Sequence, residues 1–285
     1  MLFAGLMFGI IGLSVPWTLH GQTDQHTQGS HSMEALKDLR SIRTLLIGGK
    51  VTTWLDLEYP PYDPVSTLKI KLEEAGFQVV FDPKEAHDAI FVIEYTESPS
   101  GTFRLLEQGT SVRFTTTVYH PRMGAIYENE FEATPDEVAV EGLYWGTIGK
   151  LEENPWYYYQ GFILKAWLHN QTNAGSVLIH MLRRVYTDTR YATPDERPGK
   201  AYVRRMARYN AIREIGKLKD PRALETLWEL TQMATPEERK IAVDVLGNIG
   251  DASFIPKLSQ LAETYQDSNV QLAVQAAIHT IETRR

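Results

Sequence analysis

The sequence contains no cysteine among its 285 residues. The chain therefore forms no disulfide, has no thiolate nucleophile and offers no cysteine for lipid attachment. Because cysteine-free chains occur in both oxidising and reducing compartments, this absence leaves the compartment open. It does exclude a cysteine-anchored lipoprotein.

Motifs of catalysis and cofactor binding are also missing. The sequence has no Gly-x-Ser-x-Gly, no His-Glu-x-x-His and no glycine pattern for dinucleotides. Residues 48–50, Gly-Gly-Lys, lack the further glycine and the Ser or Thr of a phosphate-binding loop. His20, His26 and His31 have a spacing that fits no compact metal site, so we expect them to be solvated. We therefore expect no metal, no cofactor and a binding protein more than an enzyme.

The N-terminal segment is apolar and uncharged over residues 1–19, and residues 20–32 contain no hydrophobic residue. This pattern is typical of a secretory signal peptide. A helix of this length, about 28 Å, would also nearly span a bilayer, so a retained anchor is the alternative for residues 1–20. Residues 21–42 are predicted as a polar linker and a short helix. We expect an exported protein, periplasmic or anchored at the outer face of a bacterial inner membrane, with membrane contact only through residues 1–19.

Charge is distributed unevenly along the chain, whose formal net charge is −7. Residues 50–160 hold 8 Lys and Arg against 19 Asp and Glu, whereas residues 161–213 hold 10 against 3. Such asymmetry predicts two faces of opposite potential. We favour an intramolecular explanation, in which the basic helices sit on or beside the acidic domain, over an anionic ligand.

Residues 43–140 are predicted as an α/β domain of the α+β class, with a mixed sheet and one main helix. Compact apolar runs at 44–48, 77–81 and 89–95 predict buried strands, and a helical face from Val65 to Ala75 ends at Gly76. Alternation over 112–118 and 125–132, around the turn at 121–124, predicts a long antiparallel hairpin. The order of these elements and the segment Ala86-x-x-Ala89-Ile-Phe-Val are loosely similar to small domains of bacterial envelope proteins, and no residue role follows from that likeness.

An aromatic helical segment is predicted at residues 141–187, followed by a linker at 188–200. Its density of Trp and Tyr, including Trp145 and Trp156, is more typical of a core at a domain junction than of a binding surface. Both residues are kept as predicted partner-binding residues under the second interpretation.

Residues 201–285 repeat themselves. The segment Ala211–Asp220 matches Ala242–Asp251 at an offset of 31, and Arg208 and Arg239 keep the same register. A weaker third copy runs through residues 274–281 with an offset of about 32, and there the glycine is missing. The pattern resembles the short bacterial form of the HEAT-repeat family over residues 203–285. The resemblance implies an all-α solenoid of stacked helical hairpins that binds partners.

The repeat spacing assigns roles to its residues. Ala211 and Ala242 are expected where neighbouring helices approach, and Arg208 and Arg239 are expected to form a structural ladder that reaches the loop aspartates Asp220 and Asp251. Because two and a half hairpins are too few to stand alone, the helices within 158–186 should cap the solenoid and join it to the α/β domain. The inner helices would then expose a partner-binding face made of Arg205, Tyr209, Arg213, Lys240, Asp244, Gln271 and Gln275.

This face is mixed in charge, which favours a protein partner over nucleic acid. The leading hypothesis is a non-enzymatic scaffold or adaptor that binds a protein through the solenoid and the aromatic junction. The alternative is a glycan-binding protein or a hydrolase that uses the acidic loop 56–63 and the aromatic segment 144–167. The sequence does not specify the oligomeric state.

Overall fold

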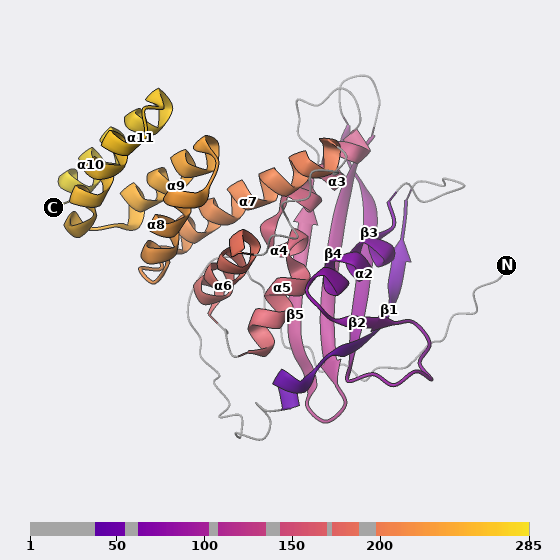
Figure 1. Cartoon of the computed structure of the whole chain (residues 1–285). Coiled ribbons are helices and arrows are strands. Elements are labelled where there is room, and N and C mark those ends of the chain that lie inside the picture. Colours follow the sequence, from indigo (N-terminus) through magenta and orange to yellow (C-terminus); the bar gives the residue numbers. More distant parts are fainter. Residues whose placement is uncertain are drawn as a thin grey trace.

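The computed structural model describes residues 38–54, 62–102, 108–134, 143–169, 173–187 and 198–284. A sheet with its covering helices forms the first half of the chain, and a run of stacked helices extends away from it (Figure 1). Among the described helices, none is long and apolar enough to cross a membrane.

The sheet has five strands in the order β2-β1-β3-β4-β5. Strand β1 (Thr44–Thr52) pairs in parallel with β2 (Gln78–Val80) and with β3 (Ala89–Thr102). Strands β3, β4 (Gln108–His120) and β5 (Gly124–Ala133) are antiparallel neighbours. The mixed sheet with its long hairpin is therefore confirmed, and β3 with β4 adds a second long antiparallel pair.

Helix α2 (Pro64–Glu74) owes its bounds to local sequence chemistry. The Asp63 carboxylate accepts hydrogen bonds from the backbone N–H groups of Val65 and Ser66, at 3.0 Å each, and Pro64 occupies the first turn. Gly76 follows the helix with a positive φ of 87°, a conformation that favours glycine. Leu68 and Leu72 are fully buried against the sheet, so the predicted helical face is the one that packs.

One face of the sheet carries the core. Phe91, Ile93 and Tyr95 of β3 are fully buried, whereas Glu94 and Thr96 between and beyond them are exposed. Helices α2 and α3 (Leu143–Glu153) pack on the buried side, over β1 and β2 and over β4 and β5 respectively. The opposite face meets no helix among the described residues (Figure 1).

Helices α4 (Pro155–Tyr158), α5 (Gln160–Leu168) and α6 (Ala174–Thr187) connect the two halves. α5 packs on α2 and on α6, and the glycine at 161 permits this closeness because a Cβ there would lie 2.2 Å from the carbonyl oxygen of Lys71. Tyr157, Tyr159 and Phe162 are buried, so most of the described aromatic segment is core.

The C-terminal helices form three hairpins: α6 with α7 (Pro198–Leu218), α8 (Ala223–Met233) with α9 (Pro236–Ile249), and α10 (Ile255–Thr264) with α11 (Ser268–Thr283). α7, α9 and α11 lie side by side in one layer, and α6 packs beside α8 in the other (Figure 1). The cap expected from residues 158–186 is thus the outer helix of the first hairpin.

The start of the third copy agrees with the offset of about 32. Helices α9 and α11 have the N-caps Thr235 and Asp267, which are 32 residues apart. Within the helices Ala211, Ala242 and Ala273 are all buried and are spaced by 31 residues. The α+β domain followed by helical repeats is confirmed, and the short helix predicted before residue 42 is described only at residues 38–41.

Candidate partner-binding face of the solenoid

Small residues let the inner helices approach closely. A Cβ added to Gly216 of α7 would lie 3.1 Å from the side chain of Val245 in α9. A Cβ added to Gly247 of α9 would lie 2.7 Å from the Cα of Ala277 in α11. The repeated glycine therefore marks the contact between successive repeats, and the three inner helices form one continuous surface.

The two repeated arginines are structural, but their partners differ from the expected ones. Arg208 Nε donates to Glu238 Oε1 of the next inner helix at 2.6 Å. Arg239 Nε donates to the carbonyl oxygen of Thr231 at 2.6 Å, and its guanidinium lies 3.6 Å from the centroid of the Tyr265 ring. The expected ladder to loop aspartates is therefore wrong. The buried Arg239 and the half-buried Arg208 bond to groups inside the hairpin stack and not to the loop aspartates.

The loop aspartates shape turns instead. Asp251 Oδ1 accepts from the backbone N–H of Ser253 at 2.8 Å, and Asp220 Oδ1 accepts from the backbone N–H of Arg222 at 2.9 Å. Both bonds join an aspartate to the residue two positions later, which fixes the start of the following helix.

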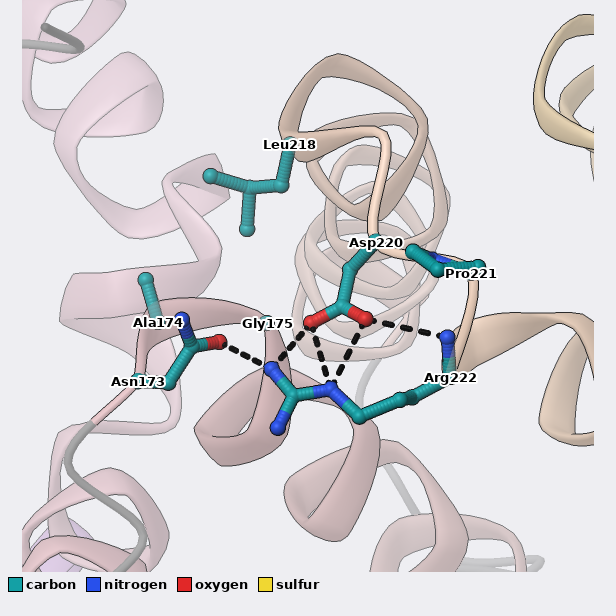
Figure 2. Close-up of a pocket in the computed structure, with 7 residues that line it drawn as sticks. All are labelled: Asn173, Ala174, Gly175, Leu218, Asp220, Pro221 and Arg222. Atoms are coloured by element: carbon teal, nitrogen blue, oxygen red, sulfur yellow. Dashed lines mark hydrogen bonds and ion pairs between the residues drawn. The ribbon is translucent and has the colours of Figure 1, made fainter. Parts of the chain in front are cut away.

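A depression of about 430 Å³ lies between the first turn of α6 and the turn from α7 to α8 (Figure 2). In it the Arg222 guanidinium contacts both Asp220 oxygens, the shortest contact being 2.6 Å, and donates to Asn173 Oδ1 at 2.7 Å. Arg222 lowers the pKa of Asp220 through these bonds. The polar groups of the depression satisfy one another. We therefore interpret Asn173, Asp220 and Arg222 as a structural contact, called the lock below, that joins the start of α6 to the turn between α7 and α8.

The inner face is where the predicted residues gather. Arg205, Arg213, Lys240 and Asp244 are exposed, and Tyr209 is half-buried. Arg213 of α7 acts electrostatically on Asp244 of α9, and Lys240 acts on Asp244 within α9. Arg205 acts within α7 on Tyr209, which lies four residues before Arg213. The five residues therefore lie on two adjacent inner helices, with Arg213 and Asp244 interacting between them.

Burial sets the acid–base behaviour of this face. It raises the pKa of Asp244, against the opposing effect of Lys240 and Arg213. Burial also raises the pKa of Tyr209, and the carboxylates of Glu238 and Glu237 add to this effect. Arg205, Arg213 and Lys240 take part in no ion pair within 4.0 Å among the described residues.

The other predicted residues lie elsewhere. Gln275 is exposed on α11, but the Gln271 amide is turned toward α10 and donates to the carbonyl oxygen of Ala262 at 3.4 Å. Trp156 is half-buried and packs against the core in α4. Trp145 belongs to α3, and its side chain lies outside the described part, as do residues 55–61 of the acidic loop. Tyr62 and Asp63, at the end of that loop, serve the core and the cap of α2.

Among the exposed apolar residues of the solenoid, Tyr202 and Leu272 lie on inner helices and were not predicted as part of the face. Tyr202 is 48% exposed and stands seven residues before Tyr209 on the same side of α7. Leu272 is 64% exposed on α11, four residues before Ala276 and three before Gln275. The helical spacing of Tyr202 from Arg205 and Tyr209 was enough to predict that the three share one face of the helix. At the offset of about 32 Leu272 matches Lys240, which is also exposed.

Buried polar groups in the α+β half join α2 and strand β3 to α3 and α4. Lys71 Nζ pairs with Glu152 Oε2 at 2.7 Å, and Glu152 Oε1 accepts from the Tyr62 hydroxyl at 2.6 Å. Tyr62 and Tyr157 hydroxyls bond to each other. A second carboxylate, Glu97, accepts from the hydroxyls of Tyr95 and Tyr144. Among the described residues no group of three or more His, Asp or Glu side chains is placed to hold a metal ion.

Three stacked hairpins with an exposed inner layer define an α-solenoid. A family model described as HEAT repeats matches residues 204–279. The C-terminal part of the chain is therefore a HEAT-repeat unit, and HEAT repeats generally mediate protein–protein interaction. No curated protein and no solved structure matches the chain.

Proposed function

We propose that the chain is a non-enzymatic scaffold or adaptor that holds a protein partner on the inner face of its solenoid. The observation that carries this proposal is the gathering of Tyr209, Arg213, Lys240 and Asp244 on adjacent inner helices. Tyr and Arg are enriched among the residues that dominate binding energy at protein interfaces. The exposed Tyr202 adds apolar area on the same helix.

The charge of the face supports a protein partner over a nucleic acid. A nucleic-acid surface needs a basic stripe free of competing acids. Here Asp244 interacts electrostatically with both Arg213 and Lys240, and Glu237 acts on Tyr209. Carboxylates in these positions would repel a phosphate backbone, whereas a protein partner can offer both signs of charge.

We further propose that this scaffold works outside the cytoplasm of a bacterial cell. The support is the uncharged apolar run of residues 1–19 followed by the polar residues 20–32. Expression of the full chain with a C-terminal tag, followed by fractionation and protease treatment of spheroplasts, tests this placement. A tag found in the cytoplasmic fraction would contradict it.

The decisive experiment for the binding face is capture of partners by the tagged full chain from native envelopes, quantified by mass spectrometry. Arg213→Glu with Lys240→Glu should remove the specific partner, because two charges at the centre of the face are reversed. Lys84→Glu, an exposed cation of the α/β domain, is the matched control and should leave capture unchanged. Equal capture by all three proteins would reject the inner face as the binding surface.

A further inference from the structure

Strand β5 has one side without a strand partner. It is the last strand in the sheet order and pairs through Val112–His120 of β4 on its other side. Among the described residues, no other element makes a backbone–backbone hydrogen bond to β5 along its free side. A strand edge of this kind presents unpaired N–H and C=O groups that can accept another chain.

The free edge of β5 is covered near the N-terminal end of the strand. The register of β4 and β5 shifts between Val118 and Tyr119, which leaves Ile126 as an extra residue in β5. The Trp167 indole of α5 donates to the carbonyl oxygen of Ile126 at 3.0 Å and packs on the Tyr127 ring. The open part of the edge therefore extends from Tyr127 to Ala133, a length of about 23 Å.

The side chains of this open part alternate between the core and solvent. Tyr127, Asn129, Phe131 and Ala133 are buried beneath the helices and hold the strand in place. Glu128, Glu130 and Glu132 are exposed on the bare face of the sheet, opposite Thr117, Thr115 and Arg113 of β4. Every exposed position of the open edge is thus acidic.

Among the described residues, one cation forms ion pairs with this group of carboxylates. Arg113 Nε lies 3.0 Å from Glu130 Oε1, and its Nη2 lies 3.8 Å from Glu132 Oε1. Glu128 has no ion pair among the described residues. The next strand of the sheet adds Glu94, directly opposite Thr115. The bare face beside the open edge therefore carries a net negative charge.

The negative charge of this edge disfavours a second copy of β5 and a nucleic acid, and it favours a basic strand. Pairing of β5 with β5 of a second copy would place glutamates opposite glutamates, and like charges directly opposite one another destabilise a strand pair. A nucleic acid would be repelled by the same charges. A strand with Lys or Arg at alternate positions would instead form cross-strand ion pairs while its backbone completes the ladder.

We propose that the open edge of β5, residues 127–133, is a docking site for an extended basic segment of a protein partner. The segment adds to the five-stranded sheet as a sixth strand, and its alternate cations face Glu128, Glu130 and Glu132. This site is separate from the inner face of the solenoid and does not depend on the proposed function of that face.

The test uses the full chain and a fluorescent peptide, Thr-Lys-Val-Lys-Val-Lys-Thr, at low ionic strength. Fluorescence anisotropy should show saturable binding that weakens with salt, and the acidic peptide Thr-Glu-Val-Glu-Val-Glu-Thr should not bind. Glu128→Gln with Glu130→Gln and Glu132→Gln should weaken binding about tenfold or more, because three cross-strand ion pairs are lost. The matched control neutralises three exposed glutamates elsewhere, Glu73, Glu263 and Glu282, and should bind as the unmodified chain does.

Two further measurements separate strand addition from simple charge attraction. A basic peptide N-methylated at every backbone amide keeps its charges but has no N–H group to donate along either edge, so its binding should be lost. Bound basic peptide should also slow amide hydrogen exchange within residues 127–133. The proposal is overturned if the unmethylated peptide does not bind, if the methylated peptide binds equally, or if the three-glutamine variant keeps full affinity. The double variant Arg213→Glu with Lys240→Glu should bind the peptide as the unmodified chain does. This result separates a failure of the β5 proposal from a failure of the inner-face proposal.

Discussion

The Glu238 carboxylate makes two structural hydrogen bonds. Its Oε1 accepts from Arg208 of the preceding repeat at 2.6 Å, and its Oε2 accepts from the backbone N–H of Thr235 at 3.2 Å. The second bond belongs to the capping box at the start of α9. The beginning of one inner helix is therefore fixed by a side chain from the inner helix before it. The side chain of Glu238 is 2% exposed, so this link is shielded from water.

Removal of Arg208 should destabilise the repeats strongly. Arg208→Met leaves a buried carboxylate without its cation, which costs about 3 kcal/mol of unfolding free energy. Urea denaturation followed by circular dichroism measures the loss. Lys217→Met is the control, because its ion pair with Glu214 is exposed and its removal should cost about 0.5 kcal/mol or less. Equal effects of the two substitutions would contradict a buried inter-repeat link.

Gly247→Ala should separate α9 from α11. The added methyl would lie 2.7 Å from backbone and side-chain atoms of Ala277, so the helices must shift at a cost of about 1–3 kcal/mol. Gly146→Ala is the matched helical control, since a Cβ there meets no atom within 4 Å and should stabilise the chain by about 0.5–1 kcal/mol. Thermal unfolding of both variants gives the comparison, and a stabilised Gly247→Ala variant would refute the close approach.

The lock of Figure 2 should depend on pH with a defined sign. Hydrogen bonds from Arg222 lower the pKa of Asp220 in the folded chain below its ordinary value of 3.8. The unfolded chain therefore binds a proton more readily, and the stabilisation is present above pH 3.8 and is lost as pH falls through the lowered folded pKa. Arg222→Gln should be less stable than the unmodified chain at neutral pH and should approach it in acid. A difference that persists unchanged into acid would show that the ion pair is not its cause.

Alkaline titration should separate the tyrosines. Burial raises the pKa of Tyr127 to about 12 and those of Tyr62, Tyr95 and Tyr157 well above their ordinary value of 10.0. The folded chain holds these protons more tightly than the unfolded chain, so stability should fall as pH rises above 10.0. Phenolate absorbance should show the exposed tyrosines ionising first, with the buried four ionising only as the chain unfolds. Simultaneous ionisation of all tyrosines in the folded chain would contradict the buried cluster.

The repeats and most strands were predictable because their signals are local or periodic. The pattern Ala211, Ile215, Gly216 recurs 31 residues later, and small residues at fixed spacing mark helix contacts. The third copy has a weaker signal because the glycine of the first two copies is missing from it. The hairpin at 112–132 was predictable because alternation reveals which side of a strand is buried.

Tertiary contacts between side chains were harder to predict than the helices and strands themselves. Arg208 and Glu238 are 30 residues apart, and sequence spacing gave no reason to prefer Glu238 over the loop aspartates. The glutamates of β5 were visible as alternation, but strand order was not. A strand is an edge only by its place in the sheet, which tertiary packing decides.

Helix α7 has a mechanical consequence. Its 21 residues form a beam about 30 Å long. Asn210 anchors it to the carbonyl oxygen of Glu153 in α3, and Arg208 anchors it to α9. A flexible tether would let molecules docked on the sheet and on the solenoid move relative to each other, whereas a helix bonded to α3 and to α9 near its middle would hold them at a set distance and angle. If both proposed surfaces bind, a partner that engages the two together would gain the affinity of chelation only where its own span matches that distance, so recognition would depend on geometry as well as on chemistry.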